Sequence, residues 1–191
     1  MSEQIHNYEQ VSIYGLDDEK REELLRTAAE CVFNWSTKDG WPVGVIMSFL
    51  WRDGRLWLTA GAHRHRIEAI RRDPRVSVVV TSTGTKLGPS KTITLKGRVR
   101  VREDAETKAW FYPALAAMVR RGDPVATKQF AEFLDSPLRV ILEVTPEKWI
   151  TYDGEKMALD TAGKLPADRK TEPASSDTQR LAAELKRRGL A

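Results

Sequence analysis

Residues 57–80 read WLTAGAHRHRIEAIRRDPRVSVVV, and this stretch carries most of the fold prediction. A strand runs into a turn of small residues, a short helix follows over residues 64–72, and Asp73-Pro74 ends it before a β-branched strand. The helix carries a cluster of basic residues: Arg64, His65, Arg66, Arg71 and Arg72. Because helix N-termini favour anions, the pattern predicts a phosphate site beside a sheet. The alternative is a solvated basic helix that only connects two strands.

Composition bounds the class of protein. The 191 residues suit one domain over residues 1–159, followed by a polar, mobile tail over residues 160–191. The net charge of +4 permits an anionic ligand but does not demand nucleic acid. The single cysteine, Cys31, excludes an intrachain disulfide and is expected in the core. The N-terminus lacks a signal pattern and no apolar run could span a bilayer, so a cytoplasmic protein is expected.

Hydrophobic patterning predicts a mainly β protein with some α structure. In residues 92–102 apolar residues alternate with polar ones, as in a strand with one wet face. The expected strands cover residues 31–35, 41–51, 56–60, 75–82, 92–102, 138–144 and 148–152, and a turn is expected at 153–154. The expected helices cover residues 17–30, 64–72, 103–121, 124–134 and 178–188. Local connections of this kind favour a six- to seven-stranded antiparallel barrel with short flanking helices and a helical insertion.

Three segments carry a resemblance to a known family. They read PVGVIMSFLWRDGRLWLTA at 42–60, RRDPRVSVVV at 71–80 and KTITLKGRVRVRED at 91–104. Together they resemble the flavin-binding split barrel of the pyridoxamine 5'-phosphate oxidase-like superfamily, over roughly residues 28–154. The resemblance implies an oxidoreductase that uses FMN, or alternatively the deazaflavin coenzyme F-420, on a small organic substrate. It also implies a homodimer with the cofactor sites at the subunit interface.

The resemblance assigns cofactor contacts residue by residue. The main chain of one strand would line the isoalloxazine ring and a second strand would continue that wall, through Val45, Ile46, Met47, Ser48, Leu58 and Thr59. The family's Arg-Lys phosphate pair falls on His65 and Arg66 when counted back from Pro74. Counted forward from Thr59 it falls on Arg64 and His65, so all three are candidates, with Arg66 first. Lys91 and Thr92 fall where the oxidase has an Arg-Gln pair near the flavin.

The chain departs from the oxidase at some of its functional positions. The oxidase's basic residues on the first flavin strand fall on Val43 and Ser48, and its substrate-binding C-terminal motif is not recognisable. Oxidation of pyridoxamine phosphate is therefore not expected, and no catalytic residue is assigned.

Two other classes of function stay open. A non-catalytic flavin-, haem- or tetrapyrrole-binding protein of the same fold is the alternative, with His63 or His65 as an axial ligand. No Cys, Asp or Glu lies at the sequence spacing from these histidines that metal-ion sites use, so no metal ion site is expected. A nucleic-acid binder ranks last, because no recognised motif accompanies the basic residues.

Overall fold

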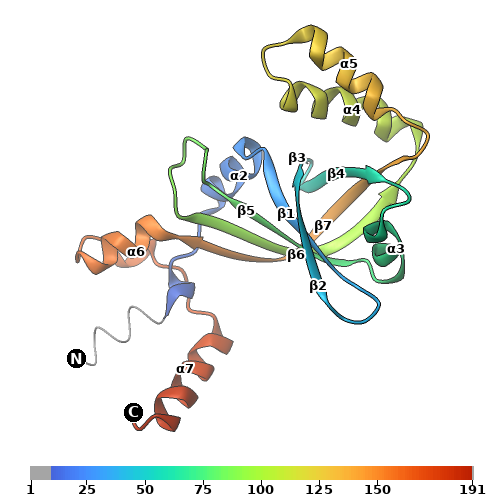
Figure 1. Ribbon diagram of the computed structural model, residues 1–191. Coiled ribbons are helices and arrows are strands. Elements are labelled where there is room, and N and C mark those ends of the chain that lie inside the picture. The colour runs from blue at the N-terminus through green and yellow to red at the C-terminus, as the bar shows by residue number, and fades with distance from the viewer. Residues whose placement is uncertain (1–9, 191) are drawn as a thin grey trace.

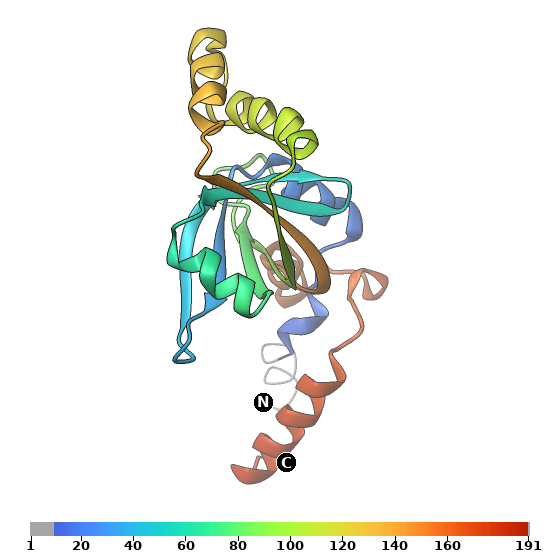
Figure 2. The same ribbon diagram turned by 90° about the vertical axis from the view of Figure 1, so that its right-hand side faces the viewer.

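The computed structural model describes residues 10–190 and contains one seven-stranded antiparallel sheet. Its order is β2-β1-β5-β6-β7-β4-β3, and the sheet curls into a half-barrel (Figures 1 and 2). The strands are β1 (Glu30–Ser36), β2 (Pro42–Ser48), β3 (Leu50–Arg52), β4 (Arg55–Gly61), β5 (Arg75–Thr81), β6 (Lys91–Arg102) and β7 (Arg139–Asp153). The predicted mainly β split-barrel class is confirmed.

The helices lie at the ends and outside of this sheet. They are η1 (Val11–Ile13), α2 (Asp18–Thr27), α3 (His65–Arg72), α4 (Ala105–Val119), α5 (Pro124–Leu134), α6 (Gly154–Thr161), η2 (Ala167–Arg169) and α7 (Ser175–Arg187). No helix among residues 10–190 is long and apolar enough to cross a membrane.

The core fills the concave side of the sheet. Alternate residues of β6 point inward, so Ile93 and Leu95 are fully buried while Lys96 is exposed. Phe33 of β1 also points inward and is fully buried, and Ile67 of α3 closes one side of the core. Burial of each such side chain stabilises the fold by about 1.5–3 kcal/mol. The period-two pattern therefore placed the inward face of β6 correctly.

Residues 41–51 were predicted as one strand, and that prediction is wrong. The chain breaks at Phe49, which is buried, so that β2 ends at Ser48 and β3 begins at Leu50. These two strands lie at opposite edges of the sheet. The sequence gives no sign of this break, because Phe49 lies inside an apolar run. Its side chain could be buried equally well in one continuous strand or in a link between two strands.

Two further local predictions are also wrong. The separate strands at 138–144 and 148–152 form the single strand β7, and a bulge accommodates Pro146. At this bulge Lys96 pairs with Lys148 while Gly97 pairs with Pro146, which leaves an extra residue on β7. The turn predicted at 153–154 is instead the start of α6, whose N-cap Asp153 accepts a hydrogen bond from the Glu155 amide at 3.0 Å.

The predicted helical insertion is a hairpin of α4 and α5 that packs on the outer side of β4 and β7 (Figures 1 and 2). Its contact with the sheet is aromatic: the Trp110 ring meets Trp57 edge-on at 5.0 Å, and Phe111 is fully buried. Asp104 and Asp123 cap the two helices through their side chains. The insertion therefore has a second, smaller core.

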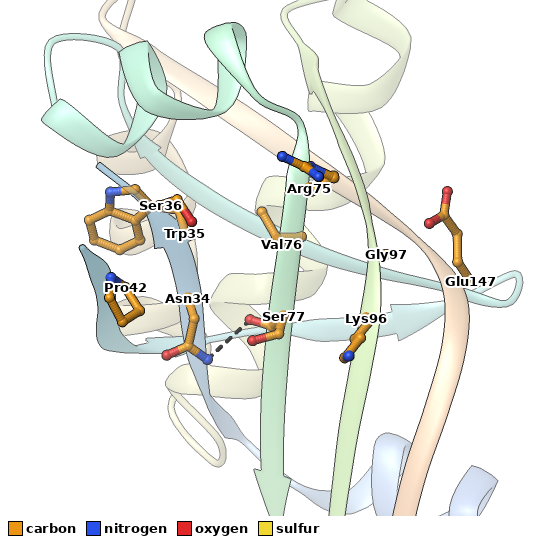
Figure 3. A pocket seen from close by; sticks show the side chains of 10 residues that line it. All are labelled: Asn34, Trp35, Ser36, Pro42, Arg75, Val76, Ser77, Lys96, Gly97 and Glu147. Atoms are coloured by element: carbon orange, nitrogen blue, oxygen red, sulfur yellow. Dashed lines mark hydrogen bonds between the residues drawn. The ribbon is translucent and has the colours of Figure 1, made fainter. Parts of the chain in front are cut away.

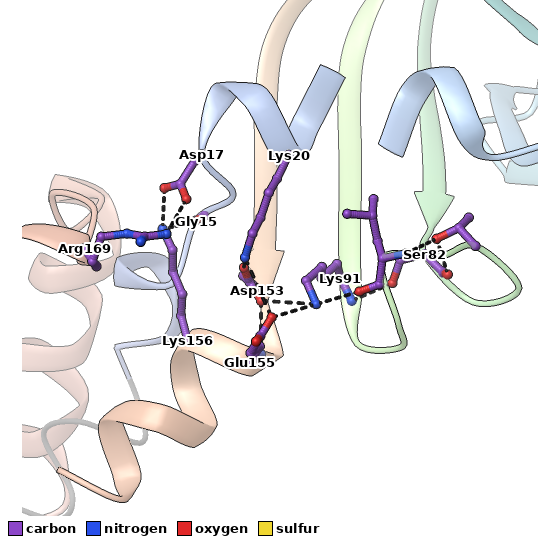
Figure 4. A network of polar contacts seen from close by, with 11 residues as sticks. Gly15, Asp17, Lys20, Ser82, Lys91, Asp153, Glu155, Lys156 and Arg169 are labelled. Carbon is purple, nitrogen blue, oxygen red and sulfur yellow. Dashed lines mark hydrogen bonds and ion pairs between the residues drawn. The ribbon is translucent and has the colours of Figure 1, made fainter. Parts of the chain in front are cut away.

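A network of buried lysines and carboxylates joins both ends of the chain to the sheet (Figure 4). The Lys156 ammonium, 2% exposed, donates to the Gly15 carbonyl at 2.8 Å and to Asp17 at 2.7 Å. The fully buried Asp153 accepts from Lys20 at 3.0 Å. Each buried charge therefore has an opposite charge beside it, as desolvation requires.

The segment after α6 returns to the N-terminal segment. The Thr171 amide donates to the Ile13 carbonyl at 2.8 Å, and its hydroxyl donates to the Ser12 carbonyl at 2.9 Å. Arg169 pairs with Asp17 at 2.8 Å, and Lys170 pairs with Asp160 at 2.8 Å. Helix α7 then extends away from the barrel (Figures 1 and 2). The helix expected at 178–188 is thus present, and mobility of the tail stays a prediction.

Acid should loosen this C-terminal attachment. Burial alone would raise the pKa of Asp17, but Lys156 and Arg169 outweigh it and lower that pKa. Hydrogen bonds from Lys170 and Tyr14 lower the pKa of Asp160. Folded pKa values below the unfolded ones mean that this stabilisation is complete above about pH 4 and lost as the pH falls through the folded values.

The protection factor of the Thr171 amide, which corrects for the slowing of chemical exchange in acid, should therefore fall between about pH 4 and pH 2, before the barrel amides lose protection. An Asp160→Asn variant should show a smaller acid response. Equal protection of this amide across that range would contradict the assignment.

Lys91 should act as a structural residue of the network. Its ammonium is buried and lies 3.2 Å from Glu155 and 3.8 Å from Asp153. Lys91→Met should lower the free energy of unfolding by about 1–3 kcal/mol, since Asp153 then keeps only Lys20 as a cationic partner. Urea unfolding measures this, with Lys86→Met on the neighbouring exposed loop as the control, expected within about 0.5 kcal/mol of wild type. Equal stability of the two variants would refute the assignment.

Candidate functional site

The candidate site lies where β4 passes into α3. Arg64 is the N-cap residue of α3 and is exposed. The helix buries Ile67 and Ile70 against the core, which aims Arg66 at the sheet. The Arg66 guanidinium donates to the Met47 thioether at 3.3 Å and lies 5.5 Å from the centre of the Trp35 ring. It is thus held over β1 and β2 by cation–π and packing contacts.

The charge of this cluster is not neutralised. Burial is the first cause that lowers the pKa of Arg66, and the charge of Arg64 is the second. Within residues 10–190, neither arginine has a carboxylate at ion-pair distance, whereas Arg71 of the same helix pairs with Glu103 at 3.1 Å. A half-buried guanidinium beside a second cation, at a helix N-terminus, fits a phosphate or another anion.

The turn before α3 is closely packed. A Cβ atom on Gly61 would lie 2.8 Å from the His63 ring, so the imidazole occupies the space that a side chain at this position would need. His63 and His65 are both exposed. No group of three or more His, Cys, Asp or Glu in the described part of the chain could hold a metal ion.

Strand β2 supplies main-chain groups beside the cluster. Within the described structure it pairs only with β1, so its other edge offers unpaired N–H and C=O groups. Val45 and Met47 pack toward the core, and Ile46 is 71% exposed on the other face. Ser48 is half-buried at the strand end. This open edge fits the predicted main-chain contacts to a flat ring.

The remaining candidates divide into two groups. Leu58 is fully buried, and the Thr59 hydroxyl donates to the Val140 carbonyl at 2.8 Å. Both side chains are therefore engaged within the fold, and these two residues could contact a ligand beside α3 only through their main-chain groups. Lys91 and Thr92 begin β6 near α6, at the opposite end of the molecule from α3 (Figure 1). Within one chain the structure therefore does not bring them to the arginine cluster, and their cofactor role stays a prediction.

Sequence reasoning missed two residues around this site. Trp35 is not among the predicted site residues, but its ring faces the Arg66 guanidinium. Arg139 is the register partner of Gly61, and its Nε atom is buried without a hydrogen-bond partner among the described residues. No sequence signal marks either contact, since both depend on which strands become neighbours.

Comparisons with known proteins identify the family and the fold of this chain. The sequence profile of the family described as pyridoxamine 5'-phosphate oxidase matches residues 16–153. No curated protein matches the chain.

Several solved structures share the fold. A conserved hypothetical protein from Mycobacterium tuberculosis has a TM-score of 0.67 at 17% identity, over 86% of this chain and 97% of that one. A structure described as F420 reductase has a TM-score of 0.52 at 22% identity, over 67% and 94% of the two chains. An FAD-binding protein from Mesorhizobium loti has a TM-score of 0.51 at 20% identity, over 71% and 92%.

These likenesses show the fold, and the profile match spans most of the half-barrel, including α3 and the open edge of β2. On that ground the chain belongs to the pyridoxamine 5'-phosphate oxidase family.

Proposed function

We propose that this protein is an oxidoreductase that binds FMN, or alternatively the deazaflavin coenzyme F-420, and acts on a small organic substrate. The observation that carries the proposal is the pair Arg64 and Arg66, which has no carboxylate partner among the described residues and adjoins the open edge of β2. Both cofactors carry a phosphate and a flat ring, which are the two groups that these elements fit.

The cofactor and the protein would have different roles in the reaction. A bound flavin or deazaflavin supplies the electron transfer, and the protein supplies position and electrostatics. Arg66 and Arg64 would hold the phosphate, because the planar guanidinium gives paired charge-assisted hydrogen bonds. Main-chain groups of β2 from Val45 to Ser48 would fix the ring edge. The Trp35 ring and Met47 would keep water from one side of the phosphate contact.

The names of two structural relatives support this class over others. One is described as F420 reductase and another as an FAD-binding protein. The alternative is a non-catalytic flavin-, haem- or tetrapyrrole-binding protein, favoured by two exposed histidines, His63 before α3 and His65 at its first position.

An absorption spectrum of the purified protein tests the class of cofactor. Flavin, deazaflavin and haem have distinct bands, so the proposal predicts a flavin or deazaflavin spectrum after incubation with FMN or F-420 and removal of the excess. A haem spectrum that is lost in a His63→Ala variant would favour the alternative. A protein that retains no flavin, deazaflavin or haem after this treatment would refute the proposal.

Arg66→Ala should weaken FMN or F-420 binding by about 10- to 100-fold, because one charge-assisted contact to phosphate is worth about 1.5–3 kcal/mol. Fluorescence titration measures the affinity. Arg71→Ala is the matched control, since Arg71 lies on the same helix but pairs with Glu103, and its affinity should be that of wild type. Equal affinity of wild type and Arg66→Ala would count against the site. A loss confined to Arg64→Ala would show that Arg64 is the main phosphate contact.

We further propose a homodimer with the cofactor at the subunit interface. Ile46 on β2 is 71% exposed and Trp41 in the adjoining hairpin is 68% exposed, so this edge offers apolar surface to a partner. Sedimentation at micromolar concentration should give the dimer mass, and Ile46→Glu should shift the protein toward monomer while weakening cofactor binding. A wild-type monomer at all concentrations would refute the proposal.

A further inference from the structure

A polar row crosses the convex face of the sheet. Register aligns Gly44 of β2, Asn34 of β1, Ser77 of β5, Lys96 of β6 and Lys148 of β7. The Asn34 amide donates to the Ser77 carbonyl at 3.2 Å, and Lys96 lies on the next strand (Figure 3). The row ends on two lysines directly opposite each other.

This lysine pair has an energetic cost. Like charges opposite each other on adjacent antiparallel strands repel, since their Cβ atoms lie about 4.5–5.5 Å apart. Neighbouring cations have partners: Arg98 pairs with Glu147 at 2.9 Å, and Arg75 pairs with Asp73. Within residues 10–190 neither Lys96 nor Lys148 has a carboxylate at ion-pair distance. The folded chain therefore keeps an unneutralised charge pair on the convex face of the sheet, next to the bulge of β7.

Cavities open on both sides of Lys96. One of about 310 Å³ lies toward Asn34 and Trp35 (Figure 3). The other, of about 510 Å³, includes both lysines and lies under the C-terminal segment. Ile150, which is 49% exposed, forms part of its wall, so the cavity combines two cations with an apolar side chain.

Hydroxyl groups in the larger cavity still have protons to donate. The Thr151 hydroxyl accepts from the Leu16 amide at 3.0 Å, and the Ser12 hydroxyl accepts from the Ala174 amide at 3.2 Å. Neither hydroxyl proton has an acceptor elsewhere in residues 10–190. Two ammonium groups and two hydroxyl donors suit an anion with several acceptor oxygens.

The acidic residues of the cavity leave this charge in excess. Asp177 is paired with Arg180, another residue of the wall, which leaves Glu172 against the two lysines. The net positive charge that remains in the cavity favours a ligand with one small anionic group and an uncharged, apolar part.

We propose that Lys96 and Lys148 bind the phosphate group of a phosphorylated small molecule, whose apolar part lies against Ile150. This site is separate from the proposed cofactor site, because Arg66 contacts Met47 and the Trp35 ring on the core side of β1 and β2. The lysine pair lies on the opposite face of the sheet. The proposal goes beyond the proposed function and does not depend on it.

Titration of the full chain with phenyl phosphate, followed by amide NMR shifts, tests the site. Shifts are expected at Lys96, Lys148 and Thr151. Lys96→Gln and Lys148→Gln should each weaken this binding at least tenfold, while Lys86→Gln, on an exposed loop, should not change it. The same shifts should persist in the double variant Arg64→Ala, Arg66→Ala, which separates this site from the cofactor site.

Stability gives a second readout. Without ligand, Lys148→Gln should unfold at a higher temperature than wild type, because it removes the repulsion. The proposal is overturned if phenyl phosphate shifts only α3 amides, if both glutamine variants bind as wild type does, or if neutralising Lys148 lowers the melting temperature.

Discussion

A single residue joins the two edges of the sheet, and the rest of the structure depends on this constraint. β2 and β3 are the outermost strands, yet only Phe49 separates them in sequence. Because consecutive Cα atoms are about 3.8 Å apart, the last residue of β2 and the first of β3 must lie within about 8 Å of each other. The sheet must therefore curl until its two edges approach each other at this one end, while the rest of the β2 edge stays open. Burial of Phe49 inside that curl offsets the cost of bending the chain there.

The cations of this protein fall into two kinds. Lys20, Lys91 and Lys156 each lie beside a carboxylate and hold the chain ends to the barrel. Arg64 and Arg66, like Lys96 and Lys148, have no carboxylate at ion-pair distance among residues 10–190. Charges that cost stability without an internal partner are the ones whose partner would come from outside the chain.

The sequence predicted the barrel class and the faces of its strands, because alternation and turn residues are local signals. It predicted α3 to within a residue, since Asp73-Pro74 marks the helix end. It failed at Phe49 and at Pro146, where the outcome depends on which distant strand becomes a neighbour. The candidate site divides in the same way. Arg66 was found from its place on a local motif, whereas its contact with Trp35 and the separation of Lys91 from α3 follow only from the folded chain.

The place of β7 in the sheet has a consequence for biosynthesis. This strand lies between β6 and β4, although it is the last strand to leave the ribosome. The four strands β2, β1, β5 and β6 can pair as soon as residue 102 has emerged. The hairpin of β3 and β4 must wait beside them, its hydrogen-bonding edge open, while some forty further residues are translated at about 5–20 residues per second. For those seconds the nascent chain presents a gap one strand wide, where a foreign strand could be captured. The α4–α5 hairpin is made during that interval, next to the edge that needs cover.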